Sequence, residues 1–260
     1  MTTPELTNHT GNVSVALIYY DNNADDDEAE YKPFCSGTWV DNTHILTAYH
    51  CAKGLQRHLQ QVQDEKEKNR PACEGIRAIL GMCDADAKPE HKTIELENLP
   101  VHYIQRKEVD QMGSEPTAWH LSKLVSWDSD KDLALLEAQG HAVPGHEVAE
   151  IADKVPEVGE FVMVVGHPKG YYWTFLTGTV AGYREVYGDK SRGPMLQLQV
   201  PAFYGNSGGG AFNQYGQLIG VTDLLPQLPA ESMYVPVESI KHFLQGARSQ
   251  QVLQELKLGK

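Results

Sequence analysis

Short apolar segments separated by polar and turn residues run through most of the chain. Residues 12–20 alternate apolar with small or polar side chains, which is typical of a strand. Residues 36–40 and 44–48 flank the turn 41–43 and predict a hairpin. The second half contains further strand-like runs, with Gly and Pro between them, at 161–165, 176–180, 195–200, 218–221 and 233–237. Short strands with this spacing predict an all-β barrel or sandwich.

Two stretches depart from the strand pattern. Residues 55–68 have a helical composition and open a long polar insertion at about 53–115, which also contains an expected strand at 101–105. The last stretch, 237–258, has a helical pattern and is expected to pack across the barrel as a closing helix. On this pattern the chain divides into two halves, residues 1–145 and 146–260.

The composition narrows the classes of partner. A chain of 260 residues with 41% apolar content can bury a sizeable core. Its net charge of −13 argues against binding to nucleic acid or to an anionic membrane, because no cluster of Lys and Arg exists to neutralise phosphates. No stretch approaches the ~20 apolar residues of a membrane-spanning helix. The first residues also lack the basic and apolar regions of a signal peptide.

Three segments carry candidate chemistry in the order His, Asp, Ser. Ser207 lies in the glycine-rich run GNSGGG, a tight loop that can project its hydroxyl; His50 lies in TAYHC, and Asp132 opens DLALL. A serine hydroxyl is a poor nucleophile at neutral pH, so it needs a histidine that takes its proton. The histidine needs a carboxylate that fixes its tautomer and stabilises its positive charge. These three residues therefore form a candidate catalytic triad.

Two other carboxylates compete for the same role. Asp128 and Asp130 lie among polar neighbours, whereas the apolar run directly after Asp132 indicates a buried strand. The first residue of that strand is expected to point into a cleft between the two halves. We therefore expect Asp132 to be the partner of the histidine.

Together these segments resemble the chymotrypsin and trypsin superfamily of serine proteases. GHPKG followed by LTGTV, and AFN followed by GQLIGV, are similar to the protease domain of HtrA-type (DegP-like) enzymes. The resemblance covers about residues 13–243 and implies two packed six-stranded antiparallel β-barrels. It also implies a serine endopeptidase that acts on protein or peptide substrates. Too few residues follow Pro236 for a PDZ domain, so we expect a protease domain without one.

The resemblance also assigns residues around the nucleophile. The backbone N–H groups of Gly205 and Ser207 would form the oxyanion hole, and glycine permits the dihedral angles that such a loop needs. The substrate pocket would be lined by Pro201, Ala202, Leu225 and Ser232. Because no carboxylate lies at the base of this pocket, we expect cleavage after small or medium apolar residues.

Two positions depart from the family pattern. Asn206 lies where trypsin-like zymogens have an aspartate that pairs with a newly formed N-terminal amine, so we expect no activation cleavage. Asp223 lies where the family usually has a small hydroxyl residue near the buried aspartate. Two carboxylates that close would raise the pKa of one of them. We therefore expect either that the Asp223 side chain turns away or that the alignment is shifted by one residue.

Four cysteines allow three disulfide pairings. The resemblance implies a bond between Cys35 and Cys51, which would leave Cys73 and Cys83 for a second, local bond. Four reduced thiols are the alternative, because no secretion signal is visible. A zinc site formed by Cys73, Cys83 and His91 has no paired C-x-x-C spacing to support it, so we expect no metal, and the resemblance implies no cofactor.

Two other functions would use the same residues. A structural or binding protein, such as a viral particle component or a pseudoprotease, would reuse the barrels but has no need of all three triad residues. An esterase would use the same triad, so only cleavage of a peptide bond separates it from an endopeptidase. The cysteine pattern is typical of an oxidising environment, whether secreted, periplasmic or particle-associated. Neither the compartment nor the oligomeric state follows from the sequence.

Overall fold

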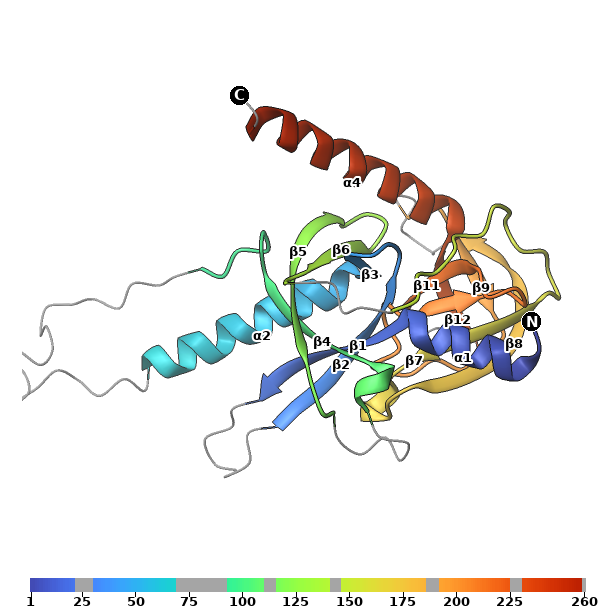
Figure 1. Ribbon diagram of the computed structural model, residues 1–260, viewed down its shortest axis with the longest axis horizontal. Helices are drawn as coiled ribbons and strands as arrows, with labels where there is room; N and C mark the ends of the chain where they lie inside the picture. The colour runs from blue at the N-terminus through green and yellow to red at the C-terminus, as the bar shows by residue number, and fades with distance from the viewer. Residues whose placement is uncertain are drawn as a thin grey trace, which may run out of the picture.

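The computed structural model describes residues 1–21, 30–68, 93–109, 116–140, 146–185, 192–224 and 231–258. These residues form two closed antiparallel β-barrels of six strands each, which lie side by side (Figure 1). The predicted all-β architecture of two packed six-stranded barrels with a C-terminal helix is therefore confirmed. No helix in the described ranges is both long enough and apolar enough to span a membrane.

The first barrel contains the predicted hairpin. Its strands are β1 (Ser14–Asp21), β2 (Glu30–Trp39), β3 (His44–Ala48), β4 (Pro100–Gln105), β5 (His120–Asp128) and β6 (Leu133–Ala138). They follow the order β1-β2-β3-β6-β5-β4, and β1 pairs with both β2 and β4 to close the barrel. Part of the segment predicted as an insertion at 53–115 therefore belongs to the barrel, because β4 lies within it.

The second barrel repeats this architecture. Its strands are β7 (Phe161–Gly166), β8 (Thr174–Glu185), β9 (Pro194–Leu198), β10 (Gly210–Phe212), β11 (Leu218–Leu224) and β12 (Ser232–Pro236). They follow the order β10-β11-β12-β9-β8-β7, and pairing of β10 with β7 closes the barrel. The short strand β10 directly follows the glycine-rich run, so the candidate nucleophile lies at the edge of this barrel.

Two helices differ from the sequence-based prediction. The helix α1 (Thr3–Val13) occupies the beginning of the predicted strand 12–20, and β1 begins only at Ser14. A capping box starts α1: the backbone N–H of Thr2 donates to the Glu5 carboxylate at 2.7 Å. The helix α2 (Tyr49–Lys68) begins six residues before the predicted position 55, so His50 lies in its first turn. Two short 3-10 helices, η1 (Arg106–Glu108) and η2 (Pro168–Gly170), complete the described elements.

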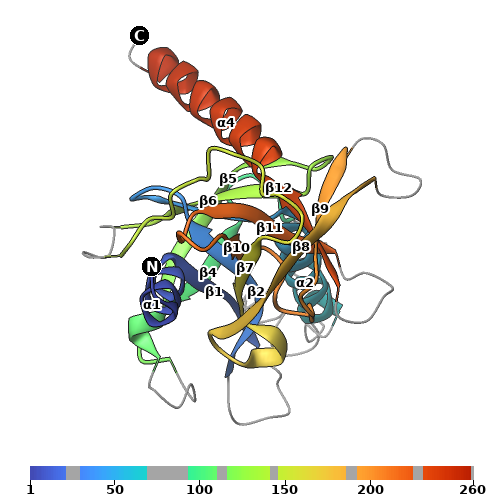
Figure 2. The same ribbon diagram turned by 90° about the vertical axis from the view of Figure 1, so that its right-hand side faces the viewer.

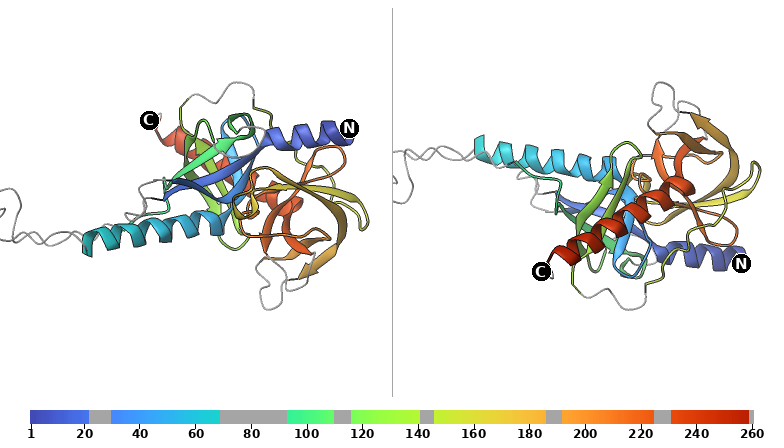
Figure 3. Two further views of the ribbon diagram at one scale, coloured as in Figure 1. Left: turned by 90° about the horizontal axis from the view of Figure 1, so that it is seen from below. Right: turned by 90° about the horizontal axis from the view of Figure 1, so that it is seen from above.

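The contact between the barrels is apolar and includes the last helix, α4 (Val237–Leu258). Leu46 of β3 and Leu133 of β6 pack there with Phe212 of the second barrel. Ile240 and Phe243 from the first turns of α4 join the same core. Figure 3 shows α4 crossing from the second barrel over the first, and Figure 2 shows its last turns pointing away from both. The start of α4 therefore packs across the barrels as predicted.

Candidate active site

His50 and Asp132 meet at the start of α2. Nδ1 of the imidazole and Oδ2 of the carboxylate are 2.6 Å apart. The backbone N–H of His50 donates to Oδ1 of the same carboxylate at 2.8 Å, and the N–H of Tyr49 donates to the Asp132 carbonyl oxygen at 3.1 Å. The first N–H groups of a helix have no partner within the helix. Asp132 therefore accepts hydrogen bonds from the first N–H groups of α2 and also fixes the orientation of the His50 imidazole.

The turn between β5 and β6 aims this carboxylate. The side chain of Asp128 accepts hydrogen bonds from the backbone N–H groups of Asp130 at 3.0 Å and Lys131 at 2.9 Å, which is typical of an Asx turn. Asp132 then adopts a left-handed φ of 54°, unusual for a residue other than glycine. Its side chain is only 2% exposed. Of the three candidate carboxylates, the structure brings Asp132 to His50, and Asp128 serves the turn instead.

The pair shifts the pKa of both partners. Burial would lower the pKa of His50, but the hydrogen bond to Asp132 and the charge of that carboxylate outweigh burial, so this pKa lies above its ordinary value. Burial would raise the pKa of Asp132, but the hydrogen bond and charge of His50 outweigh it and hold this pKa below its ordinary value. An ionised, buried carboxylate on Nδ1 makes the imidazole a stronger base at its other nitrogen.

Ser207 lies in a tight loop between β9 and β10. Gly205 and Gly208 have φ angles of 101° and 81°, which glycine adopts without steric cost. Within the described residues, the backbone hydrogen bonds of this loop use the N–H groups of Asn206, Gly208 and Gly209. None of those backbone bonds takes the N–H of Gly205 or of Ser207. These are the two donors that the family resemblance assigns to the oxyanion hole.

A buried serine and histidine brace this loop from behind. The hydroxyl of Ser36 donates to the carbonyl oxygen of Gly205 at 2.7 Å. The hydroxyl oxygen of Ser36 in turn accepts the backbone N–H of His167 at 3.2 Å and lies 2.8 Å from Nδ1 of the same histidine. Because the single hydroxyl proton goes to Gly205, Nδ1 of His167 carries the proton shared with Ser36. Burial lowers the pKa of His167 to about 3, so this imidazole stays neutral.

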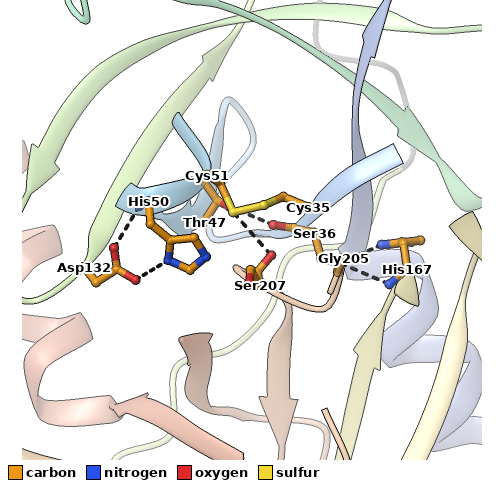
Figure 4. The surroundings of a disulfide bond; sticks show 9 residues. All are labelled: Cys35, Ser36, Thr47, His50, Cys51, Asp132, His167, Gly205 and Ser207. Carbon is orange, nitrogen blue, oxygen red and sulfur yellow. Dashed lines mark hydrogen bonds and ion pairs between the residues drawn. A yellow bond between two sulfur atoms is a disulfide. The ribbon is translucent and has the colours of Figure 1, made fainter. Parts of the chain in front are cut away.

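Cys35 and Cys51 form the disulfide that the resemblance implied (Figure 4). Cys35 precedes Ser36 and Cys51 follows His50, so this bond links the brace of the loop to the start of α2. In Figure 4 the imidazole of His50 points toward Ser207. No hydrogen bond joins that imidazole to the Ser207 hydroxyl within the described residues. Such contacts are often long before substrate binds.

Asp223 fulfils neither of the two expectations from the sequence. Its side chain is only 1% exposed, and its Oδ2 forms an ion pair with Nη1 of Arg192. One of its oxygens lies within 4.8 Å of an Asp132 oxygen and of an imidazole nitrogen of His50. Burial and the charge of Asp132 raise the pKa of Asp223 to about 7, against the opposing effect of Arg192. The carboxyl therefore turns toward the candidate triad.

The side chains of His50, Asp132 and Asp223 offer ligand atoms close enough together to suggest a cation site. Both oxygens of Asp132 already accept hydrogen bonds from His50, and Asp223 is paired with Arg192. A cation would have to displace these contacts and would lie beside a guanidinium. We therefore interpret the cluster as a network of hydrogen bonds and charges.

The residues assigned to the substrate pocket are only partly brought together. Pro201 and Ala202 are half-buried at the start of the nucleophile loop. Ser232 is fully buried, and its hydroxyl is hydrogen-bonded to the Val200 carbonyl oxygen at 2.7 Å and to the Tyr234 hydroxyl at 3.0 Å. The start of β12 thus lies against the segment that leads to Pro201. Outside the described residues lie Leu225, Cys73, Cys83 and His91.

Sequence reasoning missed three side chains that contact this site. Ser36 and His167 are 131 positions apart, and Arg192 is 31 positions from Asp223. No local spacing predicts contacts over such separations. The available signals were a serine beside Cys35 and a histidine directly after the apolar strand β7.

Comparisons with known proteins identify the family of the chain. A family model described as "Trypsin-like peptidase domain" matches residues 35–221. Relatives described as "Probable periplasmic serine endoprotease DegP-like", from Pseudomonas fluorescens and Hahella chejuensis, are 31% and 30% identical to the chain over 100 residues. Each alignment covers 38% of this chain and 21% of the relative. The similarity therefore spans about a fifth of the length of these relatives.

One solved structure supports the fold independently. The crystal structure of the serine endoprotease from Yersinia pestis matches with a TM-score of 0.59 and 16% sequence identity. The match covers 95% of this chain and 66% of that chain. The family model extends from β2 to β11 and includes the candidate catalytic segments of the first barrel as well as the loop that carries Ser207. The chain therefore belongs to the trypsin-like peptidase domain family.

Proposed function

We propose that the chain hydrolyses peptide bonds of protein substrates through an acyl-enzyme intermediate on Ser207. The observation that carries this proposal is the 2.6 Å hydrogen bond between Nδ1 of His50 and the buried Asp132 carboxylate. The imidazole that it fixes points toward the nucleophile loop (Figure 4). Family membership supports the same activity.

In the proposed reaction, Nε2 of His50 takes the hydroxyl proton of Ser207 while Oγ attacks the substrate carbonyl carbon. The carbonyl oxygen becomes negatively charged and accepts hydrogen bonds from the backbone N–H groups of Gly205 and Ser207. His50 then gives its proton to the leaving amine, and the acyl-enzyme forms. A water molecule attacks the acyl-enzyme by the same route, and Asp132 stabilises the imidazolium in both steps.

A preference for small or medium apolar residues at P1 is part of the proposal. Pro201 and Ala202 at the expected pocket base offer no carboxylate to a substrate Lys or Arg, and a buried unpaired charge costs several kcal/mol. An apolar side chain would instead gain about 25 cal/mol for each Å² removed from water.

An oxidising compartment is also proposed. The disulfide between Cys35 and Cys51 supports it, because such bonds persist in secreted and periplasmic proteins. The DegP-like relatives are themselves described as periplasmic. The alternative of a purely structural protein receives no support from the comparisons.

The test is incubation with a proteome-derived peptide library, with cleavage products identified by mass spectrometry. We expect the wild type to cleave after small or medium apolar residues. Ser207→Ala and His50→Ala should fall to near background while their folds remain intact, because the two side chains act as one unit. Ser249→Ala is the matched control, since this exposed serine of α4 lies away from the site.

Each part of the proposal has its own contrary outcome. Retention of more than about a tenth of wild-type activity in Ser207→Ala or His50→Ala would defeat the triad assignment. Hydrolysis of esters but not of peptides by the wild type would make the protein an esterase. A profile dominated by Lys or Arg at P1 would overturn the pocket assignment alone.

A further inference from the structure

One oxygen of the buried Asp223 carboxyl lacks an ordinary hydrogen-bond donor. Its Oδ2 is paired with the guanidinium of Arg192. No N–H or hydroxyl of the described residues donates to its Oδ1, although this atom is buried. Buried polar atoms in folded proteins almost always have a partner. A neighbouring acidic group that shares a proton would supply this partner.

Asp132 is that group. One oxygen of each of the Asp132 and Asp223 carboxyl groups lies within 4.8 Å of the other, and each group shifts the pKa of the other, so a shared proton would join them in a hydrogen bond. Two carboxyl groups can make such a bond only if one of them holds a proton. Both oxygens of Asp132 already accept hydrogen bonds from His50. The proton is therefore assigned to Asp223.

We propose that Asp223 is a positioning residue that donates a hydrogen bond from its protonated carboxyl to Asp132, and that Arg192 controls when this proton is lost. The inference rests on the proposed function, because it concerns the pair that activates Ser207. When Asp223 is protonated, Asp132 gains a third hydrogen bond that holds its orientation. When Asp223 loses its proton, a second negative charge lies beside the catalytic pair.

The charged groups that face Asp223 within the described residues come from three elements. Asp132 lies in the turn before β6, His50 in the first turn of α2, and Arg192 just before β9. Lys131 holds the segment that carries Arg192, because its Nζ donates to the Arg192 carbonyl oxygen at 3.0 Å. The pKa of about 7 that burial and Asp132 give to Asp223 places the change near neutral pH.

The charges of Asp223 and Arg192 shift the pKa of His50 in opposite directions. Burial and the contact with Asp132 have the largest effects on the pKa of His50. Beyond these, the charge of Asp223 raises that pKa and the charge of Arg192 lowers it. His50 must be neutral to accept the serine proton, so the acid limb of kcat/KM reports its pKa.

The first test is the pH profile of kcat/KM for single and double variants. Asp223→Asn keeps a donor for Asp132 but removes the negative charge, so the acid limb should move to lower pH by roughly one unit. Arg192→Gln added to Asp223→Asn removes only the positive charge, so the acid limb of this double variant should lie at higher pH than that of Asp223→Asn. A merely structural role would lower activity without shifting the limb in opposite directions.

The double variant sharpens the test. Without Arg192, Asp223 should stay protonated through the neutral range, and asparagine would imitate it. The limb of Arg192→Gln/Asp223→Asn should therefore coincide with that of Arg192→Gln. Lys123→Gln and Glu137→Gln make the same charge changes in a half-buried ion pair of 3.2 Å on β5 and β6, and they should leave the limb in place.

A comparison of side chains at one position tests the hydrogen bond itself. Asp223→Thr and Asp223→Asn can still donate to Asp132, whereas Asp223→Ala cannot. We expect the plateau kcat of Asp223→Ala to lie about tenfold below that of the two donor variants, in line with the loss of a hydrogen bond that orients a functional group. Thermal melts of all three variants check that each is folded.

A titration of His50 by NMR in Ser207→Ala and in Ser207→Ala/Asp223→Asn keeps the inference separate from the proposed function. A lower imidazole pKa in the second protein supports the inference even if no peptidase activity is ever found. Equal pKa values in the two folded proteins would overturn it, even if the wild type is an active peptidase. A loss of activity in Asp223→Asn as severe as that in Asp132→Asn would also overturn the inference, because Asp223 would then be needed as an anion.

Discussion

Two histidines lie beside the nucleophile loop, and each is held through its Nδ1 atom. His50 donates to the carboxylate of Asp132, whereas His167 donates to the hydroxyl of Ser36. The first has a raised pKa because its carboxylate contact outweighs burial. The second is fully buried beside a neutral partner, and burial lowers its pKa to about 3.

The difference shows that the hydrogen-bond partner of Nδ1 and the environment of Nε2 together determine what an imidazole can do. The side chain of His50 is 42% exposed, so its second nitrogen can exchange protons with a substrate. The Nε2 atom of His167 is buried with no hydrogen-bond partner among the described residues, so a proton there would have no acceptor. One histidine is thus arranged for proton transfer and the other for holding a loop.

Replacing Asp132 by asparagine should have the largest effect on the difference between the two histidines, because it gives His50 a neutral hydrogen-bond partner. The amide favours the wrong imidazole tautomer, so we expect kcat to fall by a factor on the order of 10⁴. Steady-state kinetics on the best peptide from the library measures this loss. Asp130→Asn is the control on the same turn, and a greater loss there would reject the choice of carboxylate.

Removing the second histidine should change how stability depends on pH. Because the pKa of His167 is about 3 in the folded protein and 6.5 is its ordinary value, the unfolded chain binds a proton that the folded chain does not. Stability is therefore lost as pH falls from about 6.5 toward 3, by up to about 1.4 kcal/mol per pH unit.

Urea unfolding of His167→Gln over this pH range measures the effect. The variant should be less stable than the wild type at pH 7 but should lose less stability on acidification. Ser36→Ala keeps the buried imidazole and should retain the wild-type slope. An unchanged slope in His167→Gln would show that His167 is not the group responsible.

Breaking the disulfide between Cys35 and Cys51 should lower the free energy of unfolding, because this bond links the segments that hold both histidines. The bond spans a sequence separation of 16, and loops of that length contribute roughly 3 kcal/mol to the free energy of unfolding. Chemical denaturation of Cys35→Ser/Cys51→Ser measures the loss, and reduced wild type should behave in the same way. Equal stability of the variant and the oxidised wild type would contradict the expected contribution of this bond.

The smallest expected effect comes from Ser36→Ala. This change removes the hydrogen bond that holds the Gly205 carbonyl but leaves both N–H groups of the oxyanion hole in place. We expect kcat to fall roughly tenfold, less than the ~10²-fold or more that follows direct loss of an oxyanion donor. The acid limb of the pH profile should not move, because His50 and its carboxylate are untouched.

The sequence was informative where function depends on local order. The alternating runs predicted most strands, and the short motifs around His50, Asp132 and Ser207 marked three segments that the fold brings together. The start of β1 was misplaced because the apolar alternation continues from the last turn of α1 into the strand. The capping box at Thr2 and Glu5 and the proline in the first turn are the local signals for a helix before this strand.

Contacts between distant buried polar groups could not be predicted in this way. The bond between Ser36 and His167 depends on the packing of β2 against the end of β7, and the ion pair of Arg192 with Asp223 depends on the position of the segment before β9. Neither leaves a repeat or spacing in the chain. The unusual carboxyl at position 223 was visible, but its direction required the fold.

The division of the site between two barrels also affects how the protein is made. A nascent chain that has emerged only as far as Ala138 contains His50 and Asp132 but no Ser207. Ser207, the proposed nucleophile, is synthesised later, and it meets His50, its proposed base, only when the second barrel packs against the first. Domains generally fold in order of synthesis. The proposed proteolytic activity would therefore begin only at the final assembly step, so an unfinished chain on the ribosome would lack it.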